Sequence, residues 1–246
     1  MKDPASSEPI ISLTGVSKLY TIGTNRLLAL DNLTLSFERG EFVCIVGRSG
    51  SGKSTLLNMM AGLERPSRGR IRIAGRQIER LNEAKLVEFR LQSLGFVFQS
   101  FNLFATHTAL DNVAIPLMYK GVPHAVRTRQ AYKMLDAVGL KTHMKHRPTQ
   151  MSGGQQQRVG IARALVTSPK ILFADEPTGN LDFKTSNEIL QLIRDICKQR
   201  NTTLIMVTHD HDIAKYADRV VQLLDGKVLT DERNNVKIEQ NIFKYN

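Results

Sequence analysis

The part of the sequence with the clearest chemical meaning is a run rich in glycine and serine. It consists of Gly47, Arg48, Ser49, Gly50, Ser51, Gly52, Lys53, Ser54 and Thr55. A glycine, four residues and then Gly-Lys-Ser is the spacing of a phosphate-binding loop. Glycines let the backbone approach a phosphate closely, and Lys53 can reach the β- and γ-phosphate oxygens. The Ser54 hydroxyl is a candidate Mg²⁺ ligand.

The residues on either side support this assignment. The apolar run 42–46 precedes the loop and predicts a buried strand. Leu56, Leu57 and Met60 follow at helical spacing, and Gly62 is suited to end the helix. A strand, a glycine loop and a helix N-terminus direct backbone N–H groups at a phosphate. An ordinary Gly/Ser turn would need neither the Lys-Ser pair nor these flanks.

A second segment supplies the acids that nucleotide cleavage requires. The apolar run 171–174 ends in Asp175 and Glu176. Because parallel strands place their carboxyl ends at the ligand crevice, we expect Asp175 to hold the metal and Glu176 to polarise the attacking water. His209 ends the next apolar run, 203–207, at the same edge. It can bond a γ-phosphate or the water, although a lone histidine after a strand is more often structural.

Two further side chains have a chemical role only in combination with these motifs. Gln99 follows the apolar run 94–98, and its amide oxygen suits an Mg²⁺ shell. Tyr20 ends a β-rich segment, where it can stack on a purine or pack at the sheet edge. Position alone does not choose between these two interpretations of Tyr20.

A second glycine-rich helix start occurs later in the chain. Its residues are Ser152, Gly153, Gly154 and Gln155. The segment is either a simple N-cap serine or a second anion-binding helix N-terminus. Since one nucleotide does not need two such sites, we expect each copy to present this segment to the nucleotide bound by its twin. That arrangement is a head-to-tail C₂ homodimer with nucleotides at the interface.

The composition restricts the class of protein. The chain has 246 residues, of which 41% are hydrophobic and 23% charged, as in a large globular α/β domain. No apolar run approaches the roughly 20 residues of a membrane span, and residues 1–9 lack the apolar centre of a signal peptide. We therefore expect a cytoplasmic protein, so that any membrane role must come through a partner. Cys44 and Cys197 lie in apolar segments and are expected to be buried free thiols.

The charge of +11 leaves three interpretations open: a nucleic-acid-binding face, attraction to an anionic membrane surface, or an ordinary solvated surface. The basic residues are dispersed and are not interleaved with aromatic residues. His143 and His146 are weak metal-ligand candidates, because no further ligands cluster near them in the sequence.

The order of segments predicts the organisation of the chain. Segments 10–20 and 27–37 indicate an antiparallel hairpin laid against the first core strand, and strands alternating with helices then indicate a mainly parallel sheet covered on both faces. Within the helical region we expect a helix from Ala109 to about Pro116, and where the α/β pattern returns we expect a helix from Gln156 to Val166. The expected units are a disordered start at 1–9, an ATP-binding core at 10–99 and 158–230, a helical subdomain at 100–157, and a loosely held tail at 231–246.

Taken together, these motifs resemble an ABC transporter ATP-binding subunit over about residues 10–230. The matching elements are Tyr20 as the adenine-stacking aromatic, 47–55 as Walker A, Gln99 as the Q-loop, 151–155 as the signature, 171–175 as Walker B followed by Glu176, 179–182 with Asp182 as the D-loop, and His209 as the switch histidine. Met151 stands where the family usually has Leu, and Arg48 where Pro or Ser is frequent. Neither departure removes a catalytic group.

The resemblance implies an α/β P-loop NTPase fold of RecA-like type. It has an N-terminal antiparallel β subdomain and an inserted α-helical subdomain. The implied cofactors are ATP and Mg²⁺. The implied catalytic residues are Glu176, His209 and Lys53, and the implied metal ligands are Ser54, Gln99 and Asp175.

Within this family, Asp-Glu-Pro-Thr-Gly-Asn-Leu-Asp at 175–182 resembles the MacB/LolD/FtsE group, whereas amino-acid import ATPases usually carry Ser-Ala before Leu-Asp. We expect an ATPase on the cytoplasmic face of the membrane that drives a separate permease docked near Gln99–His107, and no nucleic-acid partner. The alternatives are an amino-acid-type importer ATPase, a soluble ABC ATPase acting on nucleic acid, and a nucleotide-gated scaffold that moves no substrate.

Overall fold

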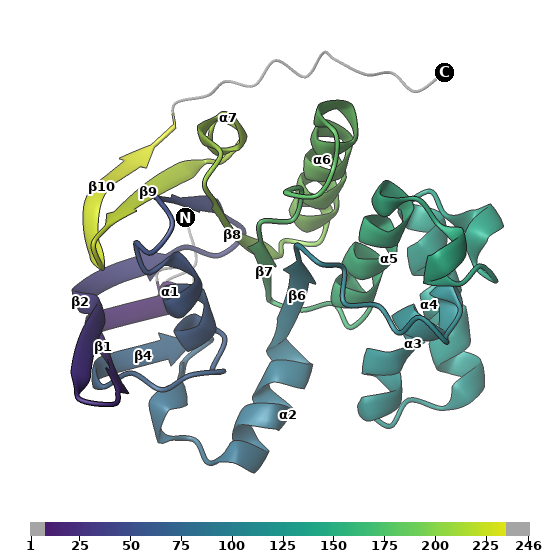
Figure 1. Ribbon diagram of the computed structural model, residues 1–246. Helices are drawn as coiled ribbons and strands as arrows, with labels where there is room; N and C mark the ends of the chain where they lie inside the picture. The colour runs from purple at the N-terminus through teal and green to yellow at the C-terminus, as the bar shows by residue number, and fades with distance from the viewer. Residues whose placement is uncertain (1–7, 235–246) are drawn as a thin grey trace, which may run out of the picture.

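The computed structural model describes residues 8–234 and contains two sheets with helices around them (Figure 1). The larger sheet has six strands in the order β10-β9-β3-β8-β7-β6. Its strands are β3 (Phe42–Val46), β6 (Leu94–Phe98), β7 (Ile171–Asp175), β8 (Thr203–Thr208), β9 (Arg219–Leu224) and β10 (Lys227–Arg233). All neighbouring pairs are parallel except β9 and β10. The predicted mainly parallel core is therefore confirmed.

The smaller sheet is antiparallel and has the order β2-β1-β4-β5. It consists of β1 (Ile11–Ile22), β2 (Asn25–Phe37), β4 (Arg68–Ile73) and β5 (Arg76–Gln77). Strand β1 of the predicted hairpin thus pairs with β2 on one side and with β4 on the other. Its buried side chains share one core with Val43 and Ile45 of β3, which is how it packs against the first core strand.

The helices connect the strands and cover the larger sheet. They are α1 (Lys53–Met60), α2 (Glu83–Ser93), α3 (Ala109–Tyr119), α4 (His124–Ala137), α5 (Gly153–Leu165), α6 (Phe183–Gln199) and the short α7 (His211–Ala214). Single 3₁₀ turns lie at Ile78–Arg80, Lys141–His143 and Pro148–Gln150.

The larger sheet separates two hydrophobic cores. Along β3, Cys44 and Val46 contribute to the core formed with α3, α4, α5 and α6, while Val43 and Ile45 contribute to the core formed with α1, α2 and the smaller sheet. This follows from the alternation of side chains along a strand, since every residue of β3 is buried. Helices α1 and α5 consequently pack on opposite faces of the larger sheet, with β6–β8 between them in Figure 1.

Two helix boundaries differ from the sequence expectations. Helix α3 continues through Pro116 to Tyr119, because Val113 and Leu117 on either side of the proline are both buried in the core. Helix α5 begins at Gly153 instead of Gln156. Glycine has a low helix propensity, but the cap formed by Ser152 outweighs it and lets the helix start at the two glycines.

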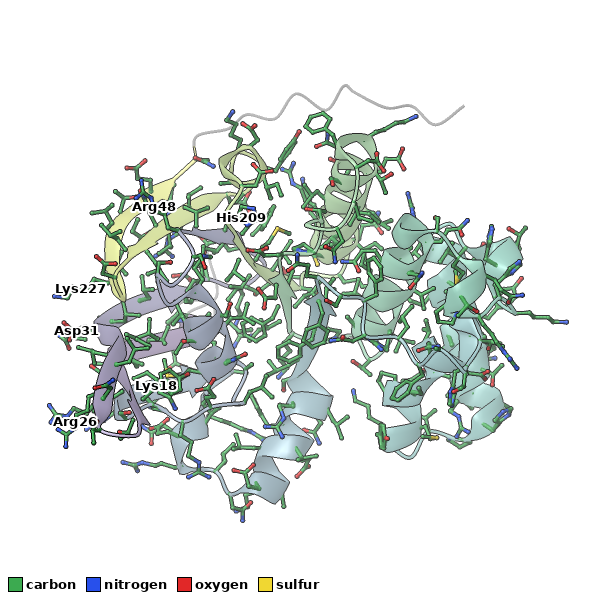
Figure 2. The ribbon with its side chains drawn as sticks, in the orientation of Figure 1. Lys18, Arg26, Asp31, Arg48, His209 and Lys227 are labelled. Carbon is green, nitrogen blue, oxygen red and sulfur yellow. The ribbon has the colours of Figure 1, made fainter. Side chains whose placement is uncertain are left out.

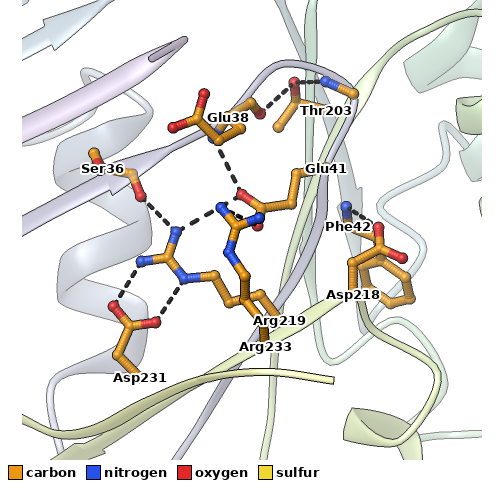
Figure 3. A network of polar contacts seen from close by, with 10 residues as sticks. Ser36, Glu38, Glu41, Phe42, Thr203, Asp218, Arg219, Asp231 and Arg233 are labelled. Carbon is orange, nitrogen blue, oxygen red and sulfur yellow. Dashed lines mark hydrogen bonds and ion pairs between the residues drawn. The ribbon is translucent and has the colours of Figure 1, made fainter. Parts of the chain in front are cut away.

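A network of ion pairs closes the end of the larger sheet that is remote from the strand C-termini (Figure 3). Arg219 at the start of β9 is 8% exposed and donates two hydrogen bonds of 2.6 Å to Asp231 of β10. It also donates to the Ser36 carbonyl at 2.8 Å and lies 3.7 Å from Glu41. Because of these bonds β10 continues to Arg233, so 231–233 are not part of a loose tail. The rest of that predicted tail, 235–246, and residues 1–7 of the predicted disordered start lie outside the described residues.

Candidate functional site

The glycine-rich loop ends at the N-terminus of α1. Gly52 is the N-cap and has φ 97°, and Gly50 has φ 80°. A Cβ on Gly52 would also lie 2.6 Å from the Ala29 carbonyl oxygen, so glycine is required there for two reasons. In this described segment the first turn of α1 has no side-chain cap and no acidic residue. Its N–H groups are therefore available to an anion.

Lys53 is a buried cation at the start of this helix. The residue is 8% exposed, and its Nζ donates to the carbonyl oxygens of Gly47 at 2.7 Å and Arg48 at 2.9 Å. Burial lowers the pKa of its ammonium, and the nearby carboxylates of Glu176 and Asp175 oppose that shift. The ammonium is thus held inside the loop, facing the two acids.

The acids follow β7 as predicted. Burial raises the pKa of the Asp175 carboxyl, the Glu176 carboxylate raises it further, and Lys53 opposes this. Such a carboxylate is stabilised by an added cation. Glu176 has φ 43°, which is a left-handed conformation that costs a residue with a Cβ about 1 kcal/mol or more. Its N–H donates to the Val207 carbonyl of β8, and this bond helps to hold the strained turn.

His209 joins the same cluster from the end of β8. Its Nδ1 lies 2.9 Å from Glu176 Oε1, and its side chain is 65% exposed against 23% for Glu176. The imidazole is therefore accessible, while the carboxylate that it contacts is mostly covered. Arg48 and His209, both labelled in Figure 2, line one cavity together with Asp225 and Gly226 of the turn between β9 and β10.

A cavity of about 920 Å³ brings many of the predicted site residues together. Its described lining consists of Tyr20, Leu27, Leu28, Ala29, Arg48, Ser49, Gly50, Gly52, Lys53, Ser54, Thr55, Glu176, His209, Asp225 and Gly226. Ser51, 3% exposed, does not line the cavity. The contribution of β2 through Leu27, Leu28 and Ala29 was not predicted, because contact across a hairpin leaves no sequence motif. Tyr20 is half-buried and lies two residues before the end of β1.

Three predicted residues have other contacts. Gln99 does not line this cavity: its Nε2 donates to Asn180 Oδ1 at 3.4 Å, and Asn180 Nδ2 donates back to the Gln99 carbonyl at 3.1 Å. Asp182 caps α6 by accepting from the Thr185 N–H at 3.0 Å. Hydrogen bonds from Thr185 hold the pKa of Asp182 below its usual range. Asp175 is not among the described lining residues; it is the last residue of β7, where it pairs with Phe98 of β6 and Val207 of β8.

The Ser152 segment is ordered by its own helix cap. Ser152 Oγ accepts from the Gln155 N–H at 3.3 Å, and Gln155 Oε1 accepts from the Ser152 N–H at 3.0 Å. Met151 is 7% exposed and packs in the core as an unbranched substitute for leucine. Among the described lining residues of the cavity, none comes from 152–155. The two glycine-rich helix starts of one chain therefore do not share a pocket.

The remaining candidates from the sequence have structural contacts. The rings of His143 and His146 have centroids 5.0 Å apart, but the described residues contain no group of three side chains suited to hold a metal ion. Cys44 and Cys197 are free and buried, as expected. In residues 8–234, no helix has both the length and the apolar character needed to cross a membrane.

The strand, phosphate loop, helix and paired acids define a P-loop ATPase cassette. A family model described as ABC transporter matches residues 30–179. The lipoprotein-releasing system ATP-binding protein LolD of Geobacter metallireducens is 45% identical over 90% of this chain and 99% of its own length. The chain belongs to the ABC transporter family and is an ATP-hydrolysing cassette of it.

Two other relatives show how much of each known protein this chain covers. The macrolide export ATP-binding/permease protein MacB of Chlorobaculum tepidum is 46% identical over 91% of this chain, which spans 34% of that protein. A solved dimeric ATP-binding cassette in a post-hydrolysis state with ADP and phosphate superposes with a TM-score of 0.84 at 40% identity, covering 91% of this chain and 98% of that one. The chain thus spans about a third of the length of the MacB relatives and nearly all of the LolD relative.

Proposed function

We propose that this chain is the ATPase of an export-type ABC transporter in which two copies close head to tail around two ATP molecules and reopen after hydrolysis. Closing and reopening would drive a separate membrane permease. The observation that carries the proposal is the separation of the two glycine-rich helix starts, since α1 and α5 pack on opposite faces of the larger sheet. Ser152–Gln155 can therefore complete the phosphate site of a second copy. Dimeric relatives of known structure support this arrangement.

The residues present fit Mg-ATP. Uncapped N–H groups and the Lys53 ammonium suit the triphosphate, the Tyr20 ring suits the base, and Ser54 with Asp175 offers oxygen ligands for Mg²⁺. Bound Mg²⁺ neutralises charge on the phosphate oxygens. We propose Gln99 as a third metal ligand, a role that requires its amide to leave Asn180.

Glu176 is the proposed general base. Its carboxylate lines the cavity beside the phosphate loop, so it can accept a proton from the water that attacks the γ-phosphate. His209 contacts that carboxylate directly and keeps it oriented. Lys53 stabilises negative charge on the leaving oxygens. Asp182 caps α6 and so positions the loop after Glu176 for contact with the second copy.

Trapping the closed state tests the pairing. Glu176→Gln removes the base and keeps the amide able to bond His209, so ATP should stay bound. We expect the molar mass of this variant, measured by size exclusion with light scattering, to be that of a dimer in ATP and that of a monomer in ADP. The matched control is the double variant Glu176→Gln/Ser152→Arg, whose added side chain should block closure. A monomer in ATP, or a dimer of the control, would refute the proposed pairing.

The permease is proposed to dock on the segment Gln99–His107. Of the three large apolar side chains in this segment, Phe101 and Leu103 are half-buried and Phe104 is 51% exposed. Arg163 fixes the segment by donating to the Phe101 carbonyl at 2.9 Å. The similarity to macrolide export and lipoprotein-releasing proteins supports export or lipoprotein release over amino-acid import, and with them a position on the cytoplasmic face of the membrane.

Phe104 provides the test of this docking. Phe104→Ser should abolish co-purification with the membrane protein bound by the wild type, while ATP hydrolysis by the free subunit persists. Tyr119→Ser is the matched control, because Tyr119 is 67% exposed at the far end of α3. Equal loss of partner in both variants would argue against docking at this segment.

A further inference from the structure

A cluster of polar side chains joins the antiparallel sheet to the helix that follows the phosphate loop. Tyr20 on β1 donates its phenolic hydrogen bond to Glu64 Oε2 at 2.5 Å, and Asn58 Nδ2 on α1 donates to Glu64 Oε1 at 3.1 Å. Lys18 Nζ lies 3.2 Å from Glu64 Oε2 and donates to the Arg65 carbonyl at 3.0 Å. A single carboxylate therefore connects β1 to α1.

The same cluster covers one face of the tyrosine ring. Lys18 and Tyr20 are two residues apart on β1 and thus share a face of the strand. Lys18 Nζ lies over the Tyr20 ring, 4.9 Å from its centroid, and Figure 2 shows Lys18 on the smaller sheet. Because the ammonium takes one face of the ring, the other face remains for a base to stack on.

The charge states suit a fixed geometry. Burial works against ionisation of Glu64, but hydrogen bonds from Tyr20, Asn58 and Lys18 outweigh it and lower the pKa of this carboxyl. Burial, followed by the hydrogen bond to Glu64, raises the pKa of the Tyr20 phenol. At neutral pH a carboxylate thus accepts from a neutral phenol. Charge-assisted bonds of this kind are shorter and stronger than neutral ones.

We propose that Glu64 is a positioning residue for nucleotide binding. Its carboxylate holds the Tyr20 ring in a fixed position relative to α1, so that the groups that bind the base and the groups that bind the triphosphate do not move relative to one another. Glu64 does not line the described cavity and acts only through Tyr20. The inference rests on the proposed base-stacking role of Tyr20. It adds a link from that ring to the helix whose N-terminus faces the phosphates.

Calorimetric titration with two probes, ATP and inorganic tripolyphosphate, tests the proposal, because tripolyphosphate has no base. For Glu64→Ala we expect the ATP dissociation constant to rise about three- to tenfold, the range for one lost hydrogen bond, with tripolyphosphate binding unchanged. Tyr20→Phe keeps the ring but loses the phenolic donor, so it should match Glu64→Ala. The double variant should be no weaker than either single one. Glu64→Gln, whose amide oxygen still accepts from Tyr20, should bind ATP more tightly than Glu64→Ala.

The outcomes that overturn the proposal are distinct. If Tyr20→Ala weakens ATP binding while Glu64→Ala leaves it unchanged, base stacking stands and positioning by Glu64 fails. If Glu64→Ala weakens tripolyphosphate as much as ATP, the residue acts on α1 in general and positioning again fails. If Tyr20→Ala itself leaves ATP binding unchanged, the base-stacking role is wrong, and the inference falls with it. Retained tripolyphosphate binding also shows that a variant is folded.

Discussion

His209 Nδ1 and Glu176 Oε1 lie 2.9 Å apart, across the carboxyl ends of the neighbouring strands β8 and β7. The two residues are far apart in sequence, and parallel pairing of buried strands brings them to one edge of the sheet. The left-handed turn at Glu176, with φ 43°, then directs its side chain to the phosphate-loop cavity. The catalytic geometry is therefore a product of sheet topology combined with one strained residue.

Removing the proton acceptor should separate binding from turnover. For Glu176→Gln we expect kcat for ATP hydrolysis to fall about 10²- to 10⁴-fold, the usual contribution of a general base. The dissociation constant for ATP should stay within a few fold of the wild-type value. Steady-state phosphate release and calorimetry measure the two quantities. Hydrolysis by this variant at the wild-type rate would show that Glu176 is not the base.

The buried ammonium of Lys53 should dominate affinity for the triphosphate. Lys53→Ala removes a cation that is 8% exposed, and we expect nucleotide binding to become undetectable by calorimetry at micromolar ATP. Lys133→Ala is the matched control, because it removes an equal charge from the exposed face of α4. A similar loss in both variants would point to net charge instead of a specific contact.

Much of this site was predictable because its motifs are local. The glycines of the phosphate loop, Lys53, and the acids after β7 are fixed by residue type and by the strands beside them. Contacts between distant segments were not predictable. The turn containing Glu64 carries no motif, and only the structure brings it to Tyr20. The bond between Gln99 and Asn180 likewise depends on tertiary packing.

In the fold, too, local features were predictable from the sequence and long-range contacts were not. Apolar runs correctly predicted four strands of the larger sheet, β3, β6, β7 and β8, since the central parallel strands of a sheet are buried on both faces. The pairing of β1 with β4 across the intervening phosphate loop and helix left no signal of its own. The extension of β10 to Arg233 is supported by the ion pair between the buried Arg219 and Asp231, a contact that the polar sequence of β10 did not indicate.

Both cysteines should resist alkylation in the folded protein. Cys44 is 0% and Cys197 is 3% exposed, and burial raises the pKa of each thiol to about 12. At pH 8 only about one thiol in 10,000 is then the reactive thiolate. We expect iodoacetamide to modify neither residue in buffer and both in urea, as measured by intact mass. Rapid labelling in buffer would contradict the burial described here.

The lowered pKa of Glu64 gives stability a defined dependence on pH. A carboxyl whose pKa is lower in the folded chain than in the unfolded chain adds stability above its unfolded pKa of about 4.3. That stability is lost as pH falls through the folded pKa. Thermal unfolding should show the largest difference between wild type and Glu64→Gln at pH 7, narrowing at more acidic pH values. A difference independent of pH would mean that ionisation of Glu64 contributes nothing.

The central claim is that each working site combines the phosphate loop of one copy with the Ser152 segment of another. Mixing two variants tests it most directly. Lys53→Ala disables the phosphate loop, and Ser152→Arg blocks the other half while leaving that chain able to bind ATP. Each variant alone should be inactive. A dimer of one with the other has one site in which both halves are intact. The arginine of its other site faces a phosphate loop that holds no nucleotide, so it has room there and the intact site can still close around ATP.

The decisive measurement is the ATPase rate of an equimolar mixture of these two variants. Random pairing makes half of the dimers mixed, each with one intact site of two, so the account predicts about a quarter of the wild-type rate. A mixture as inactive as its separate components would contradict the account, and so would full activity of Ser152→Arg on its own.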